Sequence, residues 1–454
     1  MTGPSKVRRD HALRQKDIVM TTFYDLGLPE KLVDKLVSTG IEKPSPIQEG
    51  AIPHALEGKD VMGLAQTGTG KTLAFGLPLI AKLQSYGRQP APKTARSLIL
   101  APTRELANQI KDSLAALVDG TPFKVGLVVG GVAINPQIKR VARGTDVLVA
   151  TPGRLIDLME RRALDLSKTD FLVLDEADQM LDMGFIHALR QIVGWLPETR
   201  QTMLFSATMP KLMAEISGSY LNNPVRVQVA PPGKTADKVT QGLHFIAKGE
   251  KTRLLIELLE THRDEAAIVF SRTKHGSDRL VKALDKAGYA AVTVHGNKSQ
   301  GQRERALKAF RNGEMLVLVA TDVAARGLDI PQVRHVYNYD LPNVPENYIH
   351  RIGRTARAGM DGAAVAFCSP DETDELKAIQ KVLKMDIPVL SGTPWLGMTD
   401  PSHKNKPKSG GGGRGKGGPR RHGGGNPQRS GGGGKPSGPG GGQKRRRRPS
   451  NKAA

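Results

Sequence analysis

Short β-branched segments that end near Gly, Pro, Thr or Asp recur along the chain, and stretches with helical spacing of apolar residues follow them. A first series occupies residues 60–64, 97–100, 125–129, 146–149, 171–174 and 202–205. A second series occupies residues 267–270, 291–294, 316–320, 335–338 and 363–367. Buried parallel strands that alternate with helices produce this pattern. The sequence therefore predicts two consecutive α/β domains, each built on a parallel sheet.

Residues 230–238 separate the two series and are typical of an inter-domain linker. They include Pro231, Pro232 and Gly233, which interrupt regular structure, and few apolar residues. The predicted divisions are an N-terminal extension (1–21), a first domain (22–230), a linker (231–240), a second domain (241–390), and a linker with a disordered tail (391–454). No internal repeat is visible, so the pattern does not favour a solenoid or a propeller.

Positive charge dominates the composition, with 67 Lys+Arg against 44 Asp+Glu and a formal net charge of +23. Residues 404–454 hold seven Lys, eight Arg and neither Asp nor Glu, so this segment carries +15 and the rest of the chain +8. The same segment has 18 Gly, six Pro and no aromatic residue, a composition that cannot offset chain entropy by apolar burial. We expect a negatively charged partner and a disordered tail, which either attracts nucleic acid or only solubilises the chain.

The apolar pattern and the cysteine content exclude several classes of protein. No apolar run approaches the roughly 18 residues that cross a bilayer, and the basic N-terminus lacks a following apolar stretch, so we expect neither secretion nor membrane spanning. A single cysteine, Cys368, excludes an internal disulfide framework and a Cys-rich zinc site. We interpret Cys368 as a core residue of a protein in a reducing compartment.

A candidate phosphate-binding loop follows the first apolar segment. Its residues match the P-loop pattern except that alanine stands at the first glycine position: Ala65, Gln66, Thr67, Gly68, Thr69, Gly70, Lys71 and Thr72. The glycines let backbone N–H groups point at phosphate oxygens, and the following helix adds positive potential. Lys71 can reach the β- and γ-phosphates and Thr72 can offer a hydroxyl to Mg²⁺, so the loop predicts a nucleoside triphosphate site.

Two adjacent carboxylates follow the apolar strand predicted at residues 171–174. Asp175 is the expected second ligand of the magnesium ion, largely through water. Glu176 stands one residue further on, where it can orient or deprotonate the water that attacks the γ-phosphate.

At Asp175-Glu-Ala-Asp178 the chain resembles the DEAD-box family of ATP-dependent RNA helicases, and matching motifs follow in order over about residues 22–385. The resemblance implies two tandem RecA-like P-loop domains that use ATP with Mg²⁺ and act on RNA. It implies that Gln48 of the Q motif hydrogen-bonds the adenine edge. It also places Phe23 and Ile41 at the nucleotide, although Ile41 replaces a more usual aromatic residue.

The resemblance further assigns contacts to RNA and residues that couple hydrolysis to strand separation. The RNA contacts bind the backbone rather than the bases and are Pro102, Arg104, Gly131, Thr151, Gly153, Arg154, Arg272 and Thr321. The coupling residues are Asp178, Ser206, Thr208, His350 and Arg351. Taken alone, residues 206–208 could equally be a helix cap before Pro210.

Three positions near the end of the second predicted domain complete the implied ATP site. Arg354 and Arg357 match the family's arginine fingers, which stabilise charge on the transferring phosphoryl group, and Asp329 matches a ribose or inter-domain contact. Ala356 stands where glycine is commoner. Because these groups lie in a different domain from Lys71, the resemblance implies that hydrolysis requires the domains to close.

The expected function is an RNA-stimulated ATPase that locally unwinds short RNA duplexes or remodels RNA–protein complexes. The same motifs leave open an ATP-gated RNA clamp or annealing chaperone, a DNA helicase, and an inactive scaffold. The tail and the segment 349–359 resemble the bacterial RhlE group. This narrower resemblance implies a cytoplasmic, monomeric core, with single-stranded or short duplex RNA, and with ribosomal precursors or RNA-decay proteins, as partners.

Overall fold

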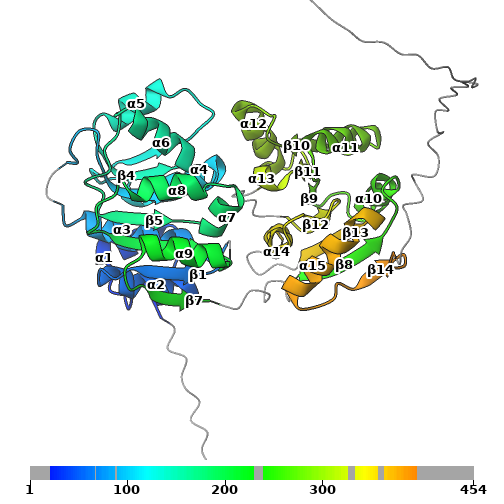
Figure 1. The fold of residues 1–454 in the computed structure, drawn as a ribbon, viewed down its shortest axis with the longest axis horizontal. Helices are drawn as coiled ribbons and strands as arrows, with labels where there is room; N and C mark the ends of the chain where they lie inside the picture. Colours follow the sequence, from blue (N-terminus) through cyan, green and yellow to red (C-terminus); the bar gives the residue numbers. More distant parts are fainter. Residues whose placement is uncertain are drawn as a thin grey trace, which may run out of the picture. The chain divides into compact units, whose positions relative to one another are not determined.

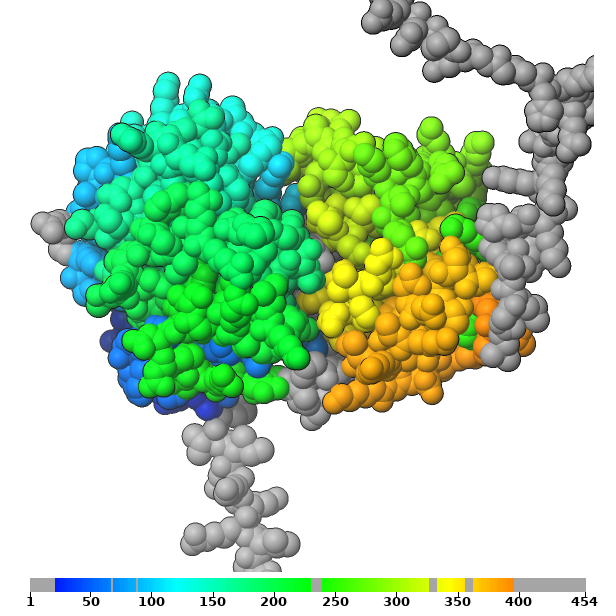
Figure 2. Space-filling model, in the orientation of Figure 1, coloured from blue at the N-terminus to red at the C-terminus, as the bar shows by residue number. Residues whose placement is uncertain are grey.

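A computed structural model of the chain describes residues 21–66, 68–86, 89–229, 239–325, 333–355 and 362–395. These residues form two lobes, here called the first lobe (21–229) and the second lobe (239–395), and each contains a seven-stranded parallel sheet (Figure 1). The colours of Figure 2 show that each lobe is built from one continuous stretch of the chain. The predicted pair of parallel α/β domains is confirmed.

The first lobe contains seven strands in the order β3-β4-β2-β5-β6-β1-β7. The strands are β1 (Val61–Leu64), β2 (Ala95–Leu100), β3 (Val125–Val128), β4 (Thr145–Ala150), β5 (Phe171–Leu174), β6 (Gln201–Ser206) and β7 (Val225–Gln228). The helices are α1 (Glu30–Ser38), α2 (Pro46–Leu56), α3 (Lys71–Leu83), α4 (Arg104–Val118), α5 (Asn135–Val141), α6 (Pro152–Glu160), α7 (Ala177–Asp182), α8 (Ile186–Val193) and α9 (Lys211–Tyr220).

The second lobe has the same strand order, with each strand number raised by seven: β10-β11-β9-β12-β13-β8-β14. The strands are β8 (Val239–Phe245), β9 (Ala267–Phe270), β10 (Ala291–Val294), β11 (Val317–Ala320), β12 (His335–Asn338), β13 (Gly362–Cys368) and β14 (Val389–Ser391). The helices are α10 (Lys251–Glu260), α11 (Lys274–Lys286), α12 (Gln300–Arg311), α13 (Asp322–Ala325), α14 (Glu346–Ile352), the 3₁₀ turn η2 (Pro370–Glu372) and α15 (Thr373–Leu383).

Each sheet lies between two hydrophobic layers. In the first lobe, α1 to α4 pack on one face and α5 to α9 on the other. In the second lobe, α10 and α11 cover one face, and α12 to α15 cover the other. Apolar side chains on both faces explain the continuous apolar runs in the strands. Because all strands of a sheet are parallel, the loops after them gather at one edge, where open α/β sheets bind ligands.

Three strands escape the sequence pattern, namely β7, β8 and β14. Among the described residues, β7 and β14 are the last strands of their sheets and pair on one side only, and β8 contains the polar residues Thr240, Gln241 and His244. β8 begins at Val239, so it enters the segment predicted as a linker. Exposed or polar positions remove the apolar signal on which the prediction depended.

The second lobe also continues beyond the boundary predicted at residue 390. Ser391 Oγ lies 2.6 Å from Nδ1 of His244, and the Trp395 indole donates to the Cys368 carbonyl over 3.0 Å. Cys368 is fully buried, and burial raises the pKa of its thiol to about 12, as suits a core residue. The segment from 396 to 454, which includes the basic tail, lies outside the described residues.

Candidate functional site

The predicted phosphate-binding loop connects β1 to α3 in the first lobe. The Ala65 amide donates to the Ser206 carbonyl over 3.0 Å, which ties the start of the loop to β6. Gly70 precedes the helix in the left-handed region at φ 89°, and a β-carbon there would lie 2.9 Å from Ser45 Oγ and overlap the Gln48 amide. The close approach therefore requires glycine. Gln66, Gly68 and Thr69 lie in the described part of the loop, whereas Thr67 lies outside it.

The Q-motif glutamine connects helix α2 to the phosphate loop. Gln48 Oε1 accepts from the Ser45 amide over 2.8 Å, which completes a capping box at the start of α2. Gln48 Nε2 donates to the Gly70 carbonyl over 2.9 Å, and Ser45 Oγ donates to the Thr69 carbonyl over 2.8 Å. The residue that the family resemblance assigns to adenine thus also fixes the last turn of the loop.

Phe23 and Ile41 differ in how far their side chains are exposed. The Phe23 ring is fully buried in the hydrophobic core of the first lobe, and Ile41 packs against the same core while remaining partly exposed. Phe23 therefore supports the Q-motif segment from beneath and presents no surface to a nucleotide in this structure. Of the two, Ile41 retains an accessible face.

Lys71 begins α3 and lies beside the carboxylates that follow β5. Its Nζ is 3.8 Å from Asp175 Oδ1, and both side chains are almost fully buried. The Asp175 carboxylate also accepts from the Glu176 amide over 2.9 Å. Burial raises the pKa of both carboxyl groups, and the Lys71 charge opposes this rise. The arrangement gathers one cation and two desolvated acids at the edge where β1 and β5 end.

Glu176 combines backbone strain with an unpaired carboxylate. Its φ of 50° is in the left-handed region, which is unusual for a residue other than glycine. Only 2% of the residue is exposed, yet neither carboxylate oxygen has a hydrogen-bond partner among the described residues. A buried polar group without a partner indicates a ligand site. The Glu176 carboxylate is suited to bind a water molecule, including one bound to Mg²⁺. Oxygen atoms of Thr72 and Asp175 would hold the Mg²⁺ ion.

Asp178 anchors the segment that follows β6. Its Oδ2 accepts from the amides of Ala207 and Thr208 over 3.1 and 2.8 Å and from Thr208 Oγ1 over 2.9 Å. Ser206 Oγ donates to the Thr208 carbonyl over 2.6 Å. The side chain of Asp178 therefore connects α7, which follows the two carboxylates, to residues 206–208.

The residues assigned to RNA in the first lobe gather around the loop after β3. The Arg104 guanidinium lies against Gly131, whose φ of 70° and lack of a side chain make room for it. Arg154 donates to the Val132 carbonyl over 3.0 Å, and its Nη1 is buried with no hydrogen-bond partner among the described residues. Burial lowers the pKa of Arg104, and the nearby Arg154 charge lowers it further. Such a cluster of cations suits phosphate groups.

Other RNA-site candidates lie at the same edge of the sheet. Pro102 follows β2, while Thr151 stands at the N-cap position of α6 and Gly153 is exposed in the first turn of that helix. Sequence reasoning missed Gln137, which holds the β3 loop through bonds to the Val129 amide and carbonyl over 2.9 and 3.1 Å. A lone glutamine in a short helix carries no sequence signal for this role.

In the second lobe, the buried Arg351 side chain connects several segments. Its guanidinium makes two bonds to the Asp322 carboxylate, over 2.5 and 2.8 Å, and further bonds to Asn338 and the Asp340 carbonyl. This joins α14 to α13, a connection that the sequence did not reveal because the partners are 29 residues apart. His350 and the nearly buried Arg354 line a small pocket beside it.

Two further predicted residues of this lobe lie after β9 and β11. Arg272 donates to the Leu341 carbonyl and to Glu372, both over 3.1 Å, so its guanidinium is largely engaged within the lobe. Thr321 accepts from the amides of Ala324 and Ala325 and so begins α13. Asp329 and Arg357, predicted at the ATP site, lie outside the described residues.

A separate group of ligand-type side chains lies where β12 begins. Nitrogen and oxygen atoms of His262, Glu265 and His335 lie within 4.8 Å of one another. The imidazole rings stack at 3.5 Å with an angle of 6°, His262 bonds the Tyr337 hydroxyl, and His335 bonds Glu265. Each histidine already bonds a neighbouring side chain of the second lobe, so we describe the group as a hydrogen-bonded cluster.

Comparison with known proteins identifies the family. The DEAD/DEAH box helicase family matches residues 45–216, and the helicase conserved C-terminal domain matches residues 250–359. A DEAD-box ATP-dependent RNA helicase named CshA from Bacillus cereus is 44% identical over 376 residues, covering 82% of this chain and 71% of the relative. The chain belongs to the DEAD-box ATP-dependent RNA helicases. The prediction of an ATP-dependent enzyme of this class, with Mg²⁺ as its usual ion, is thereby confirmed.

Solved DEAD-box structures share the fold. S. cerevisiae Dbp5 bound to RNA and ADP BeF3 has a TM-score of 0.72 and 32% identity, over 81% of this chain and 94% of that chain. Mss116p bound to ssRNA and AMP-PNP has a TM-score of 0.74 and 28% identity, over 82% of this chain and 80% of that chain. Within the described part of this DEAD-box chain, no helix is long and apolar enough to cross a membrane.

Proposed function

We propose that this chain hydrolyses ATP at the edge of the first lobe where β1 and β5 end, and that Glu176 activates the attacking water. The observation that carries the proposal is the buried Glu176 carboxylate, which lacks a partner among the described residues and lies next to Asp175 and Lys71. Its pKa is raised by burial, so the carboxylate accepts a proton more readily than an exposed glutamate. Lys71 and the amides of the phosphate loop would hold the β- and γ-phosphates, and Mg²⁺, when bound, would supply positive charge to neutralise them.

The Glu176→Gln variant tests this role. The amide keeps the shape of the side chain and cannot take a proton, so RNA-stimulated turnover should fall roughly 100-fold or more while ATP and RNA still bind. Glu198→Gln, at an exposed position of the same lobe, is the matched control and should keep normal turnover. Near-normal hydrolysis by Glu176→Gln would remove the base role from this residue.

The RNA substrate is proposed to lie along the arginine cluster of the first lobe and to continue to Thr321 of the second. Arg104 and Arg154 would bind phosphates without reading bases, so recognition would be independent of sequence. Arg354 and Arg357 belong to the second lobe, so ATP hydrolysis would require both lobes to close on the nucleotide. RNA and ATP would then raise each other's affinity, because coupling free energy is reciprocal.

Strand separation follows if the closed lobes accept only a bent single strand. The enzyme would locally unpair short duplexes and release the RNA after hydrolysis. Turnover measured with single-stranded RNA, single-stranded DNA or neither tests the substrate, and equal stimulation by DNA would overturn the RNA assignment. A duplex-release assay beside an annealing assay distinguishes unwinding from the alternative of an ATP-gated clamp.

We also propose a subgroup within the family, a cellular compartment and partners for this chain. The Gly-, Lys- and Arg-rich tail supports a place in the RhlE group, although the relatives compared carry the name CshA. A cytoplasmic, monomeric enzyme that acts on ribosomal precursors or with RNA-decay proteins would fit either name. Sequencing RNA crosslinked to the protein in cells would identify the targets.

A further inference from the structure

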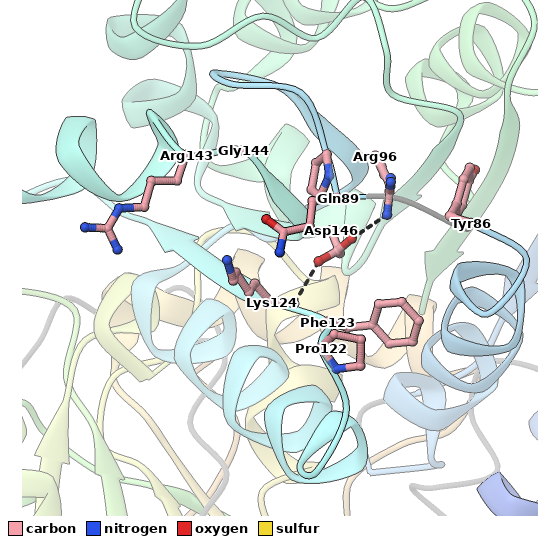
Figure 3. A pocket seen from close by; sticks show the side chains of 10 residues that line it. Tyr86, Gln89, Arg96, Pro122, Phe123, Lys124, Arg143, Gly144 and Asp146 are labelled. Carbon is pink, nitrogen blue, oxygen red and sulfur yellow. Dashed lines mark hydrogen bonds and ion pairs between the residues drawn. The ribbon is translucent and has the colours of Figure 1, made fainter.

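A pocket of about 190 Å³ opens at the edge of the first lobe where strands β2, β3 and β4 begin. Its apolar lining comes from Tyr86, Pro90, Pro122 and Phe123. Figure 3 shows the Phe123 and Pro122 rings side by side on one wall, below the Asp146 carboxylate. The volume matches a single large side chain and is below the roughly 300 Å³ of small-molecule sites.

A buried ion pair forms the floor of the pocket. Arg96 Nη1 donates to Asp146 Oδ1 over 2.7 Å, and the Lys124 amide donates to Asp146 Oδ2 over 2.9 Å (Figure 3). The Arg96 guanidinium also lies 4.5 Å from the centre of the Tyr86 ring, whose hydroxyl donates to Asp170. Arg96 and Asp146 therefore neutralise each other within the protein, and the contact with Arg96 fixes the Tyr86 ring in the pocket wall.

The rim of the pocket is positively charged. The lining includes the exposed residues Lys124 and Arg143, and its single carboxylate, Asp146, is already paired with Arg96. The excess positive charge of the rim therefore favours a partner that carries carboxylates or phosphates around the group that enters the pocket.

The position of the pocket argues against RNA as its occupant. The pocket residues lie at or just before the beginnings of β2, β3 and β4, whereas Arg104, Gly131 and Thr151 follow the ends of these strands. Six residues of an extended strand span about 20 Å, so the two sites lie on opposite edges of one sheet. An occupant of the pocket leaves the nucleotide and RNA residues accessible.

We propose that this pocket docks a short peptide segment of a partner protein, in which one bulky apolar side chain is flanked by acidic residues. The apolar residue enters between Tyr86 and Phe123, and the carboxylates pair with Lys124 and Arg143 at the rim. Grooves lined by aromatic side chains are a recurring binding site for extended peptides. Such a segment would tether the helicase to a larger assembly while its opposite edge acts on RNA.

Labelled peptides and the full-length chain test the proposal. The probe is a fluorescein-labelled heptapeptide with a central tryptophan flanked by aspartates, and its partner peptide has alanine at the centre. Burial of the large side chain should make the tryptophan peptide bind about 10-fold tighter or more in fluorescence anisotropy at 0.15 M salt. The basic tail attracts both peptides equally, so this difference isolates the pocket.

Variants locate the binding. Lys124→Glu combined with Arg143→Glu should weaken the tryptophan peptide at least 5-fold, and Phe123→Ala should remove most of the preference for tryptophan. Lys31→Glu reverses an exposed charge elsewhere on the first lobe and should leave binding unchanged. RNA-stimulated turnover of the pocket variants should equal that of the wild type, which also shows that they fold.

Two results would overturn the proposal. The first is equal affinity for the tryptophan and alanine peptides, or binding that the pocket variants do not weaken. The second is loss of single-stranded RNA affinity in the double charge reversal while peptide binding persists, which would assign this face to nucleic acid.

Discussion

Gly131→Ala tests the arginine cluster because it displaces a cation without removing one. A β-carbon at residue 131 would overlap the Arg104 guanidinium, whereas at the neighbouring Gly130 it would lie 3.7 Å from the same group, an ordinary contact. Residue 131 also has φ 70°, which costs alanine about 1–2 kcal/mol and is partly offset by lower entropy of the unfolded chain. We therefore expect a loss of about 1 kcal/mol in the free energy of unfolding, with Arg104 moved from its place.

The effect on RNA follows from the loss of one phosphate contact. Losing about 1–2 kcal/mol of charged hydrogen bonding lowers RNA affinity about 5- to 30-fold. The slope of log affinity against log salt for a single strand should become shallower by about 0.7. Fluorescence anisotropy with labelled polyuridine at several salt concentrations measures both quantities, and turnover without RNA should not change.

Gly130→Ala is the matched control because it adds the same methyl group where there is space for it. Its RNA affinity and salt slope should equal those of the wild type. If Gly131→Ala also binds RNA normally, the Arg104 guanidinium does not contact phosphate from this position, and the RNA path in the first lobe must be assigned elsewhere.

Three further outcomes are expected. Glu372→Gln should lower the free energy of unfolding of the second lobe by about 3–5 kcal/mol in urea titration, because it leaves the buried Lys251 without its partner at 2.5 Å, whereas the control Glu375→Gln, near a partly exposed arginine, should cost less than about 1 kcal/mol; equal losses would refute the buried-pair argument. Burial, and secondarily the neighbouring His335, lowers the pKa of His262, so the folded lobe binds this proton less readily than the unfolded chain, and stability should fall as pH drops from 7 towards 5; His262→Gln should flatten this fall in thermal melts, and an unaltered profile would contradict it. Deletion of residues 404–454 should weaken RNA binding and its salt dependence while ATP binding is spared, and unchanged RNA affinity at low salt would give the tail another role.

The sequence predicted the residues of the nucleotide site better than the hydrogen bonds that hold these residues in position. Lys71 and Asp175 follow apolar strands in a fixed local pattern, so their meeting at one sheet edge could be inferred before any coordinates. Gln48 was assigned to adenine, but its bond to the Gly70 carbonyl joins segments 22 residues apart, and no periodicity reveals such a contact.

Burial and distant pairing account for the other differences. Phe23 matched a motif position, yet its ring is in the core, because a motif records which residue is present and not which way it faces. Arg351 was grouped with coupling residues, and the structure shows in addition that it binds Asp322, which lies 29 residues earlier in the chain and gives no local signal. β8 was partly assigned to a linker because a strand with polar positions lacks the apolar run that marks its neighbours.

The shared strand order of the lobes has a consequence for nucleotide stoichiometry. In both lobes a buried lysine begins the helix after the corresponding strand and faces an aspartate beyond the sheet, Lys71 with Asp175 at 3.8 Å and Lys251 with Asp340 at 3.7 Å. In the second lobe, however, Lys251 also binds the Glu372 carboxylate at 2.5 Å and the Tyr339 carbonyl at 2.8 Å. In the second lobe the Glu372 carboxylate therefore binds the lysine that corresponds to Lys71, the residue proposed to hold a phosphate in the first lobe. We therefore expect one ATP per molecule, because Lys251 of the second lobe is already engaged by a carboxylate of its own lobe.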